Sequence, residues 1–434
     1  MKASRFSIIF LLLFTYATAQ DTSFTLKQAI DLAIAQNLEI QMASSDLEIA
    51  QINNNWGNTG ALPIVAANLS NTEAVSNINQ KLVNGNTIQR NNVSNNAINS
   101  NVSINWRIFN GMRIRSTKER FEILERMGSI ALQQQIDQIV FDVSNLYYDI
   151  VRLNKEIIAT EAIINLSKER QKIAETRFNV GSGAKTDLLQ AEIDLNAQEV
   201  DLENTFNQLA NAKAQLNAIL KRGPEEIIHV TDQDFNIVEV DLAKLIANLE
   251  NQNYQLLIAQ QEKNNLLQER KIINSQRLPV LSLNSNTVLN RSSSTAGFFL
   301  TNQTFGPNIG LSVGIPIFNG NINKTQLKAN SIQQKRQDLQ IEQLRNTLRR
   351  DMMMAYQDYK NALVVTNIEK ENVKLAEENN FISIERFRKL FSNSIELRQA
   401  QLSLIEAQNR YINAQFRAQV AVNTLKFLSG EISK

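Results

Sequence analysis

The sequence predicts a mainly α-helical chain with a small β part, built from one structural unit that occurs twice. Two observations indicate this fold class: a motif that recurs about 209 residues apart, and heptad-spaced apolar residues over long stretches without proline. A third is a pair of stretches in each copy where apolar and polar residues alternate, which is the period of a β-strand. Each copy is therefore predicted to join long helical hairpins to two strands.

The recurring motif reads RFNVGSGAKTDLLQAEIDL from Arg177 and RFRKLFSNSIELRQAQLSL from Arg386. The same spacing pairs two Ile-Phe-Asn-Gly sequences, Ile108–Gly111 and Ile317–Gly320. Leu62-Pro63 pairs with Leu278-Pro279 after a shift of about seven residues, so the first copy has a longer loop between these landmarks. We expect a first repeat over 20–222 and a second over 241–428.

The chain begins with a predicted secretory signal peptide over residues 1–19. Lys2 and Arg5 precede an apolar stretch at 6–14, and an Ala-x-Ala cleavage site follows at 17–19. This stretch is shorter than the roughly 20 apolar residues of a transmembrane helix, and no later stretch approaches that length. The sequence thus predicts an exported chain with no helical membrane anchor.

Composition argues against several classes of function. The chain has no cysteine, which excludes disulfides and thiolate metal sites, and its 45 basic and 43 acidic residues argue against a nucleic-acid partner. His229, within Ile-Ile-His-Val, is expected to be a half-buried strand residue rather than a base or metal ligand. With no glycine-rich phosphate loop and no acidic cluster at metal spacing, we expect no enzyme activity, no metal and no cofactor.

The first repeat should begin with a helix and continue with strands near 62–75 and 99–109. The second strand alternates clearly, with Val102, Ile104, Trp106 and Ile108 on one face. In the second repeat we expect a helix over 241–275 and strands near 278–290 and 307–318. Loops rich in Asn and Ser are expected to join each pair, at 71–100 and 290–306. The strands have the length of transmembrane β-strands, although two surface hairpins packed on helices remain an alternative.

Long helices should follow the strands, at 112–178 and 322–389. Apolar residues at steps of three and four indicate a coiled-coil seam in the first, at Ile136, Ile139, Val143, Leu146, Ile150, Leu153 and Ile157. At 1.5 Å per residue such a helix reaches about 100 Å. Returning helices are expected at 186–222 and 395–428, and an alanine row at heptad spacing in the latter permits close helix approach: Ala400, Ala407, Ala414 and Ala421.

The chain turns back between these helices at two hairpin tips, 180–185 and 390–394. In the first tip Gly181 supplies the positive φ of the turn, and Thr186 or Asp187 should cap the returning helix. In the second tip Leu390 stands at the position of Gly181, so Asn393 or Ser394 must form the turn. The two tips are predicted to be similar but not equivalent.

Four strands cannot close a barrel, and open sheet edges are not tolerated in hydrocarbon. Because bacterial outer-membrane barrels begin at about eight strands, the chain must oligomerise, and three copies would supply twelve. The same rotation would arrange about twelve helical strands around a common axis as a tube. The sequence therefore favours a homotrimer with a 12-stranded β-barrel continued by an α-helical barrel.

The chain resembles the TolC-like outer-membrane efflux proteins over nearly its whole mature length. The tip motifs RFNVG…TDLLQAE (Arg177 to Glu192) and IELRQAQ (Ile395 to Gln401) carry the resemblance most specifically. It implies a trimeric outer-membrane channel of a Gram-negative cell that extends into the periplasm, with an equatorial layer that includes 223–240 and the tail 429–434. It also implies two partners, a periplasmic adaptor and an inner-membrane transporter of the RND or ABC type.

The implied function is passive export of drugs and small toxic molecules. The outer-membrane channel of a type I protein secretion system is the alternative within the family, because substrate choice lies largely with the inner-membrane partner. A structural coiled-coil envelope protein without a channel is the alternative from another class, but it gives no reason for amphipathic strands in duplicate.

The resemblance also implies a gate at the periplasmic entrance. Acidic side chains just after the second tip narrow this entrance in the family, and Glu396 occupies one such position. The residue one turn further, acidic in the best-known relative, is Gln399 here, so a trimer would have a single carboxylate ring that favours cations. An equally open interpretation of Glu396 is stabilisation of the helix N-terminus, worth about 0.3–1 kcal/mol.

Asp187 matches an aspartate that helps to hold a relative closed through an arginine. The position of that arginine is Ser392 here, so the same salt bridge cannot form, and Arg386 or Arg388 is the suggested substitute. For Asp187 we favour helix capping. Adaptor docking is expected at both tips, where Phe391 would be exposed, around Val180, Gly181, Ser182, Gly183, Leu390, Phe391, Ser392 and Asn393.

Overall fold

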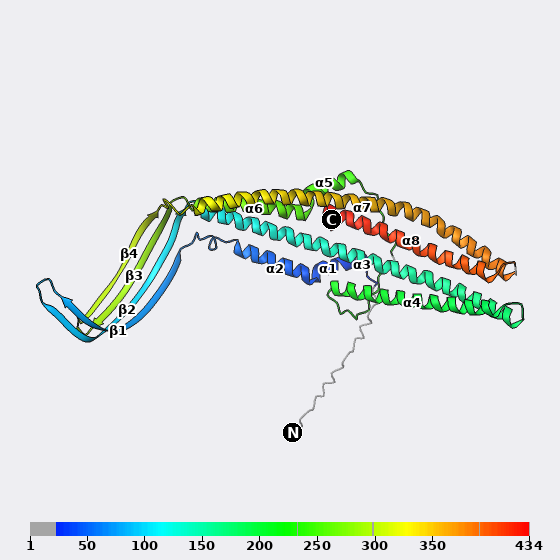
Figure 1. Ribbon diagram of the computed structural model, residues 1–434, viewed down its shortest axis with the longest axis horizontal. Coiled ribbons are helices and arrows are strands. Elements are labelled where there is room, and N and C mark those ends of the chain that lie inside the picture. Colours follow the sequence, from blue (N-terminus) through cyan, green and yellow to red (C-terminus); the bar gives the residue numbers. More distant parts are fainter. Residues whose placement is uncertain (1–22, 232, 297–298, 390, 434) are drawn as a thin grey trace, which may run out of the picture. The chain divides into compact units, whose positions relative to one another are not determined.

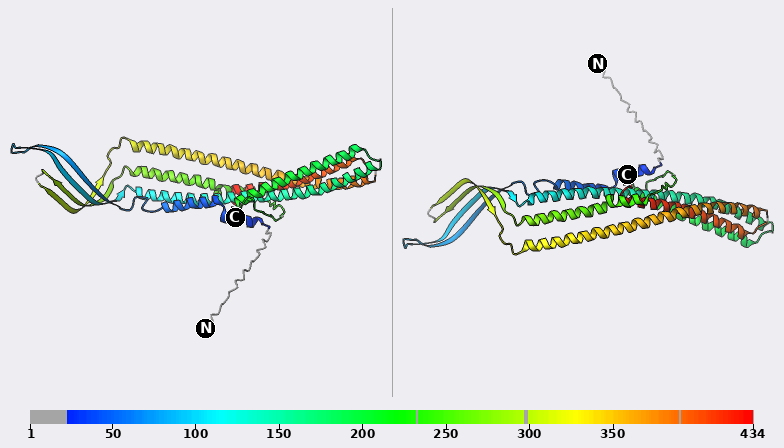
Figure 2. Two further views of the ribbon diagram at one scale, coloured as in Figure 1. Left: turned by 90° about the horizontal axis from the view of Figure 1, so that it is seen from below. Right: turned by 90° about the horizontal axis from the view of Figure 1, so that it is seen from above.

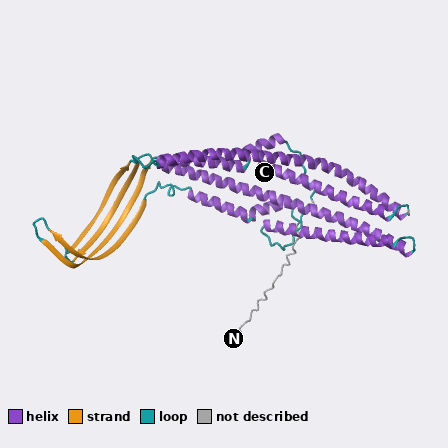
Figure 3. Cartoon of the chain, viewed as in Figure 1, coloured by secondary structure: helices purple, strands orange, loops and turns teal. Residues whose placement is uncertain are grey.

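A computed structural model describes residues 23–231, 233–296, 299–389 and 391–433. The predicted signal peptide at 1–19 lies outside the described residues. The chain divides into two compact units. The helical unit comprises residues up to Leu38, 137–245 and 352–434, and the strand unit comprises 39–136 and 246–351. Each unit therefore contains segments of both repeats, and all strands belong to the strand unit (Figure 3).

The order of helices and strands is the same in the two repeats (Figure 1), which confirms the duplication. The long helices α3 and α7 contain 67 residues each and contribute to both units. The elements of the first repeat are α1 (Leu26–Gln36), α2 (Leu38–Asn53), β1 (Ile64–Lys81), β2 (Thr87–Asn110), α3 (Arg113–Asn179) and α4 (Lys185–Ile219). Those of the second are α5 (Leu242–Gln252), α6 (Tyr254–Ser275), β3 (Val280–Ser294), β4 (Thr301–Gly314), α7 (Ile322–Arg388) and α8 (Ser394–Ser429).

The predicted helix over 241–275 is instead two helices, α5 and α6. Asn253 interrupts it with an extended backbone at φ −66° and ψ 120°, and its side chain accepts a hydrogen bond from the Leu256 amide at 3.2 Å. Asn competes well for backbone N–H groups, so it begins a new helix rather than continuing the old one.

The strand unit contains one antiparallel sheet in the order β1-β2-β3-β4. Its central pair, β2 with β3, joins the two repeats and places Ser103 opposite Asn286. The loops expected at 71–100 and 290–306 are wrong, because most of these residues continue the strands: β1 pairs with β2 as far as Lys81 opposite Thr87. Asn and Ser have low strand propensity, but sheet context overrides it, and Asn96 bonds across strands to Asn71 at 2.9 Å.

In the view of Figure 1 the helices of the helical unit follow in the order α7, α8, α3 and α4, and Figure 2 gives two further views. Asn423 of α8 bonds to Asn145 of α3 at 2.8 Å, and Arg410 of α8 pairs with Glu369 of α7 at 3.0 Å. The predicted seam of α3 is largely confirmed, since Ile139, Val143, Ile150, Leu153 and Ile157 are buried. The alanine row of α8 is buried as well, which explains the close approach of its neighbours.

Residues 223–231 and 233–240 form no helix or named strand and belong to the helical unit. The Phe24 amide donates to the His229 carbonyl at 2.8 Å, and the hydroxyl of buried Tyr147 donates to the Phe24 carbonyl at 3.1 Å. The expectation for His229 is wrong in one respect: its neighbour Ile228 is the buried residue, and the His229 side chain is exposed. A single parallel bridge, Phe24 with Val230, fixes which of the two side chains points inward.

Candidate functional site

One face of the sheet is apolar and exposed. The strand register places Val65 opposite Ile104, Trp106 opposite Leu283, and Leu283 opposite Leu311. These side chains form a mainly apolar band across the four strands, which Ser285 and Thr287 of β3 interrupt. The band is solvent-accessible in the single chain, with Leu69 76% and Ile309 75% exposed. A contiguous apolar surface of this kind fits hydrocarbon rather than water. We refer to it as the apolar face.

The opposite face is polar and almost free of charge where all four strands run together. Residues that alternate with those of the apolar face are mainly Asn and Ser, and their side chains bond to one another across strands. Asn101 Nδ2 donates to Asn286 Oδ1 at 3.1 Å, and Asn284 Nδ2 donates to the Ser312 hydroxyl at 3.1 Å. A sheet with one lipophilic and one wettable face can separate a membrane from an aqueous lumen.

Two kinds of site are absent from the part of the chain that the structure describes. No described helix carries an apolar stretch long enough to cross a membrane. Within the same residues, no group of acidic or histidine side chains has the arrangement of a metal site.

The first hairpin tip has the glycine turn that the sequence predicts. Gly181 has φ +75°, and the amides of Ser182 and Gly183 donate to the Arg177 carbonyl at 2.9 and 3.0 Å. The predicted cap by Thr186 or Asp187 is wrong, because Ala184 is the N-cap and α4 begins at Lys185. The turn delivers Ala184 already extended, so Asp187 falls in the first turn of α4, where a carboxylate complements the helix dipole.

The second tip is closed by Asn393. Its side chain accepts a hydrogen bond from the Glu396 amide at 2.9 Å, and its backbone is extended at φ −99°, so it caps α8 rather than forming a left-handed turn. Phe391 is 74% exposed at this tip, and Val180 is 70% exposed at the first. Ser392 is half-buried, and the expectation for Leu390 lies outside the described residues.

Glu396 forms an ion pair with Arg386 at 3.4 Å on the surface of the second tip. Gln399 is exposed one turn further along α8, on the same side of the helix. Neither suggested arginine reaches Asp187: Arg386 pairs with Glu396, and Arg388 pairs with Glu169 and Glu385. Among the described residues Asp187 has no ion-pair partner, and no hydrogen bond joins it to Glu396.

A buried charge cluster that sequence reasoning missed lies near the tips. Asp194 of α4 accepts hydrogen bonds from Arg170 Nη2 of α3 at 2.7 Å, from Arg398 Nε of α8 at 2.7 Å, and from Gln190 Nε2 at 2.8 Å. Arg170 is only 2% exposed. One carboxylate therefore connects the first hairpin with the second.

The electrostatics of this cluster depend on burial and on charge-assisted hydrogen bonds. Burial raises the pKa of the Asp194 carboxyl, but the bonds from Arg398 and Gln190 and the charge of Arg170 outweigh it, so the pKa lies below its usual range. Burial also lowers the pKa of Arg170, which the charge of Asp194 opposes. The Arg170 Nε atom has no hydrogen-bond partner among the described residues, so removal of Asp194 would leave a buried cation without compensation.

The sequence did contain a signal for half of this cluster. Thr160, Ile163, Ser167, Arg170 and Ala174 continue the seam of α3 at steps of three and four, and all are buried. A charged residue at a seam position needs a partner. The partner Asp194 lies 24 positions away, and Arg398, which shares this carboxylate, lies 228 positions from Arg170. Periodicity within one helix does not reveal which residues of other helices face it.

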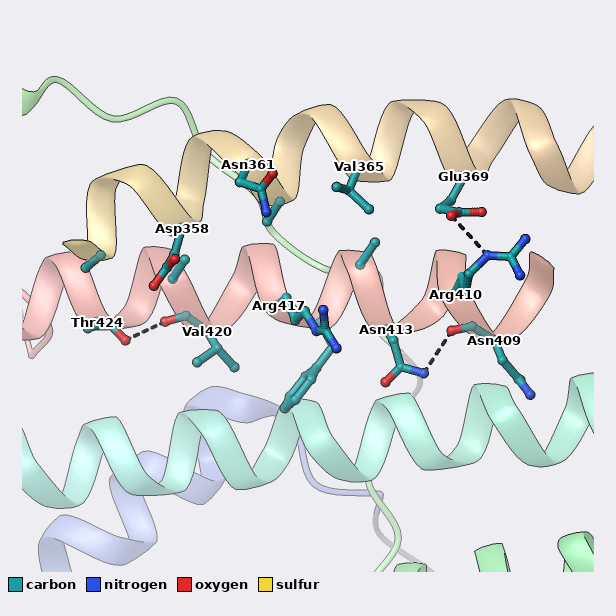
Figure 4. Close-up of a pocket in the computed structure, with 15 residues that line it drawn as sticks. Asp358, Asn361, Val365, Glu369, Asn409, Arg410, Asn413, Arg417, Val420 and Thr424 are labelled. Atoms are coloured by element: carbon teal, nitrogen blue, oxygen red, sulfur yellow. Dashed lines mark hydrogen bonds and ion pairs between the residues drawn. The ribbon is translucent and has the colours of Figure 1, made fainter. Parts of the chain in front are cut away.

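A groove of about 630 Å³ lies between α7 and α8 in the helical unit (Figure 4). Small side chains form much of its lining, including Ala355, Ala362 and Ala414. Glu369 and Arg410 form an ion pair across the helix pair at one end, whereas Asn413 donates a hydrogen bond to Glu156 of α3 at 2.8 Å. Two members of the alanine row of α8, Ala414 and Ala421, line the groove, and these small side chains leave its space unfilled.

Comparisons with known proteins agree with this arrangement. The family model described as outer membrane efflux protein matches residues 29–221 and 245–431. A search of the curated proteins finds no match.

Solved structures of low sequence identity share the fold. The CmeC outer-membrane channel of Campylobacter jejuni is similar with a TM-score of 0.80 at 15% identity, over 94% of this chain and 85% of that one. The outer-membrane protein VceC of Vibrio cholerae gives a TM-score of 0.75 at 16% identity, over 93% and 96% of the two chains. The MtrE outer-membrane channel of Neisseria gonorrhoeae, solved in an open state, gives 0.75 at 16% identity, over 94% and 89%.

Proposed function

The chain belongs to the outer membrane efflux protein family, and from this premise we propose that it is the outer-membrane exit channel of a tripartite export system. In this role it passively conducts drugs and small toxic molecules to the exterior and performs no chemistry itself. The observation that carries the proposal is the two-faced sheet, whose apolar face fits lipid and whose polar face fits a water-filled lumen.

The sheet also supports a homotrimer in the outer membrane. Its outer strands β1 and β4 each have one unpaired edge within the chain, and unpaired backbone groups are costly in hydrocarbon. Three copies of four strands give a closed barrel of twelve, within the size range of bacterial outer-membrane barrels. The free heptad rows of α4 and α7 support the same ring, since Leu189, Ile193 and Val200 on α4 and Ile368, Leu375 and Ile382 on α7 are exposed.

The tips are the proposed contact with the periplasmic adaptor, through which an inner-membrane transporter of the RND or ABC type delivers the substrate. Val180 and Phe391 are large apolar side chains exposed on turns, which is unfavourable unless a partner covers them. Glu396 and Gln399, at the start of α8, are the proposed constriction residues. A ring of three Glu396 carboxylates would favour cations. The ion pair with Arg386 would reduce the negative charge of this ring.

Membrane fractionation separates this proposal from a structural coiled-coil protein. The processed chain should sediment with the outer membrane and run on unheated gels as an oligomer that heating converts to monomer. A chain recovered in the soluble periplasmic fraction, with no heat-sensitive oligomer, would contradict the proposal.

A further inference from the structure

We propose that β4 and the segment 315–319 pair with β1 of a second copy in one defined register, with Ser312 opposite Ser70 and Phe318 opposite Val65. The inference rests on the proposed oligomeric channel and goes beyond it by naming the residues that meet at the subunit seam. It is argued from the internal duplication, because the chain already contains one junction of the same kind.

The junction inside the chain is the pairing of β2 with β3. There the last strand of the first repeat pairs with the first strand of the second, and Ser103 lies opposite Asn286. The pairing passes a bulge after Arg107 and ends with Phe109 opposite Leu281 and Asn110 opposite Val280. In a ring of copies, the last strand of the second repeat meets the first strand of the next chain in the corresponding way.

Two sequence motifs relate the residues of the β2–β3 junction to those of the proposed junction between β4 and β1 of the next copy. The Ile-Phe-Asn-Gly motifs align β2 with β4, so that Ser103 corresponds to Ser312 and Phe109 to Phe318. The Leu-Pro motifs align β3 with β1, so that Asn286 corresponds to Ser70 and Leu281 to Val65. Ser103 opposite Asn286 therefore becomes Ser312 opposite Ser70 across the seam.

The second junction is visibly incomplete in the single chain. Residues 315–319 lie outside β4, whereas their repeat counterparts 106–110 belong to β2. Ile317 is 96% and Phe318 77% exposed, against 45% and 37% for Ile108 and Phe109. These apolar residues have no strand to pair with in their own chain.

Two glycines show the same contrast. Gly111 and Gly320 both have φ +66°, but a Cβ at Gly111 would lie 2.7 Å from Leu278 Cβ, whereas a Cβ at Gly320 would meet nothing within 4 Å. The Leu-Pro turn of the second repeat fills the space beside Gly111. We infer that Leu62 of the next copy fills the space beside Gly320.

The translated register keeps apolar residues together near the Leu-Pro motif, although farther along it places Ile309 opposite Glu73. It places Val313 opposite Leu69, Ile315 opposite Ala67 and Phe318 opposite Val65, which continues the apolar face, and it places Ser312 opposite Ser70 on the polar face. A slip by one residue would set Val313 against Asn68 or Ser70 and is thereby disfavoured. A slip by two residues keeps the alternation, so the experiment must distinguish it.

The helices of the strand unit show the same difference between the two repeats. α3 is hydrogen-bonded to α2 and to α6, through Gln135 to Glu39 at 2.7 Å and through Arg120 to Asn265 at 3.0 Å. In the described part of the strand unit, the interhelical hydrogen bonds of α7 go to α5 and α6, as with Arg345 to Glu250 at 2.9 Å and Asn330 to the Leu266 carbonyl at 3.2 Å. Ile332 of α7 is 67% exposed although its repeat counterpart Ile123 is buried. The translation assigns α2 of the next copy to this free side.

Disulfide trapping tests the register, and the natural chain has no cysteine to interfere. The test variant is the double substitution Ser70→Cys with Ser312→Cys. Directly opposed residues of antiparallel strands have Cα atoms about 4.5–5.5 Å apart, within the range of a disulfide. Ser103→Cys with Asn286→Cys is the matched control within one chain, and Asn68→Cys with Ser312→Cys represents the two-residue slip.

After oxidation of the assembled oligomer, the Ser70/Ser312 pair should run as covalent dimer and trimer on heated, non-reducing gels. Each single variant should remain monomeric, and the control pair should close within the monomer. Cross-linking through Asn68 instead of Ser70 would overturn the register. Absence of both cross-links in an intact oligomer would overturn the proposed register but not the channel. Absence of any oligomer by light scattering would contradict the proposed function as well.

Discussion

At the scale of single residues, we expect Asp194 to contribute more to the stability of the helical unit than its neighbours do. It is the shared acceptor of Arg170 and Arg398, and so it connects α3, α4 and α8 at one point. Removing one partner of a buried ion pair costs about 3–5 kcal/mol, because the remaining charge stays buried. An exposed pair is worth only about 0–1 kcal/mol.

Asp194→Asn should therefore lower the midpoint of thermal unfolding clearly, because Arg170 loses its counter-ion. Glu199→Gln is the matched control on the same helix, since its pair with Lys168 at 3.6 Å is about half exposed. Circular dichroism of the purified protein measures both. Equal midpoints for the two variants would show that the buried cluster contributes no more than a surface pair.

The pH dependence of this contribution follows from the direction of the pKa shift. Because the pKa of Asp194 is lowered in the folded chain, the stability it adds is fully present above its unfolded pKa of about 3.9 and is lost as pH falls through the folded pKa. The difference in melting midpoint between wild type and Asp194→Asn should stay constant from pH 7 to about 4 and shrink below that. A difference that already disappears between pH 7 and 5 would contradict the assignment.

Sequence reasoning succeeded at residues whose role is set by their immediate neighbours. Gly181 is such a residue, because the turn itself demands a positive φ. It failed for the cap of α4, where the glycine turn places the helix start before Thr186, and for Asp194, whose partners come from other helices. The roles of Glu396 and Gln399 as constriction residues stay predictions.

At the scale of secondary structure elements, each strand lies where the sequence predicted one, but its ends differ. β1, β2 and β3 extend further toward the hairpin turns than predicted, and β4 runs from Thr301 to Gly314 rather than over 307–318. Alternation of apolar and polar residues marks the part of each strand that carries the apolar face. Beyond it, Asn and Ser occupy both faces, and only the cross-strand ladder from Asn71 opposite Ile98 to Lys81 opposite Thr87 keeps the chain extended. Propensity within one segment does not contain that information.

The two faces of β2 should respond differently to the same substitution. Ile104→Arg places a charge on the apolar face and should destabilise the assembled barrel by about 2–4 kcal/mol if that face meets hydrocarbon. Ser103→Arg, one residue away on the polar face, should assemble normally and shift ion selectivity. The fraction of heat-modifiable oligomer in the membrane measures assembly. Equal losses for both variants would contradict the assignment of the faces.

At the scale of the whole molecule, the architecture consists of one unit that occurs twice, and the sequence alone was sufficient to detect this duplication. Two repeats give four strands and two hairpin tips, and both features are incomplete without partners. The subunit seam was not predictable from the sequence, because its register becomes readable only once the pairing of β2 with β3 is known. That pairing then serves as a template for the contact between copies.

Docking at the tips should be separable from assembly and conduction. Phe391→Ser combined with Val180→Ser removes the two exposed apolar side chains, so export by the complete system should fall while the oligomer stays intact. Lys185→Ser, which changes a polar residue beside the first tip, is the control. Unchanged export by the double variant would remove the tips as a docking surface.

The channel is tested most directly by single-channel recordings of the detergent-purified oligomer in planar lipid bilayers, with Glu396→Ala beside wild type. We predict small, discrete, cation-selective openings for wild type, and openings that enlarge or lose selectivity when the carboxylate ring is removed. Conductance that Glu396→Ala leaves unchanged would remove Glu396 from the constriction. No conductance from a well-folded, membrane-inserted oligomer would contradict the channel itself.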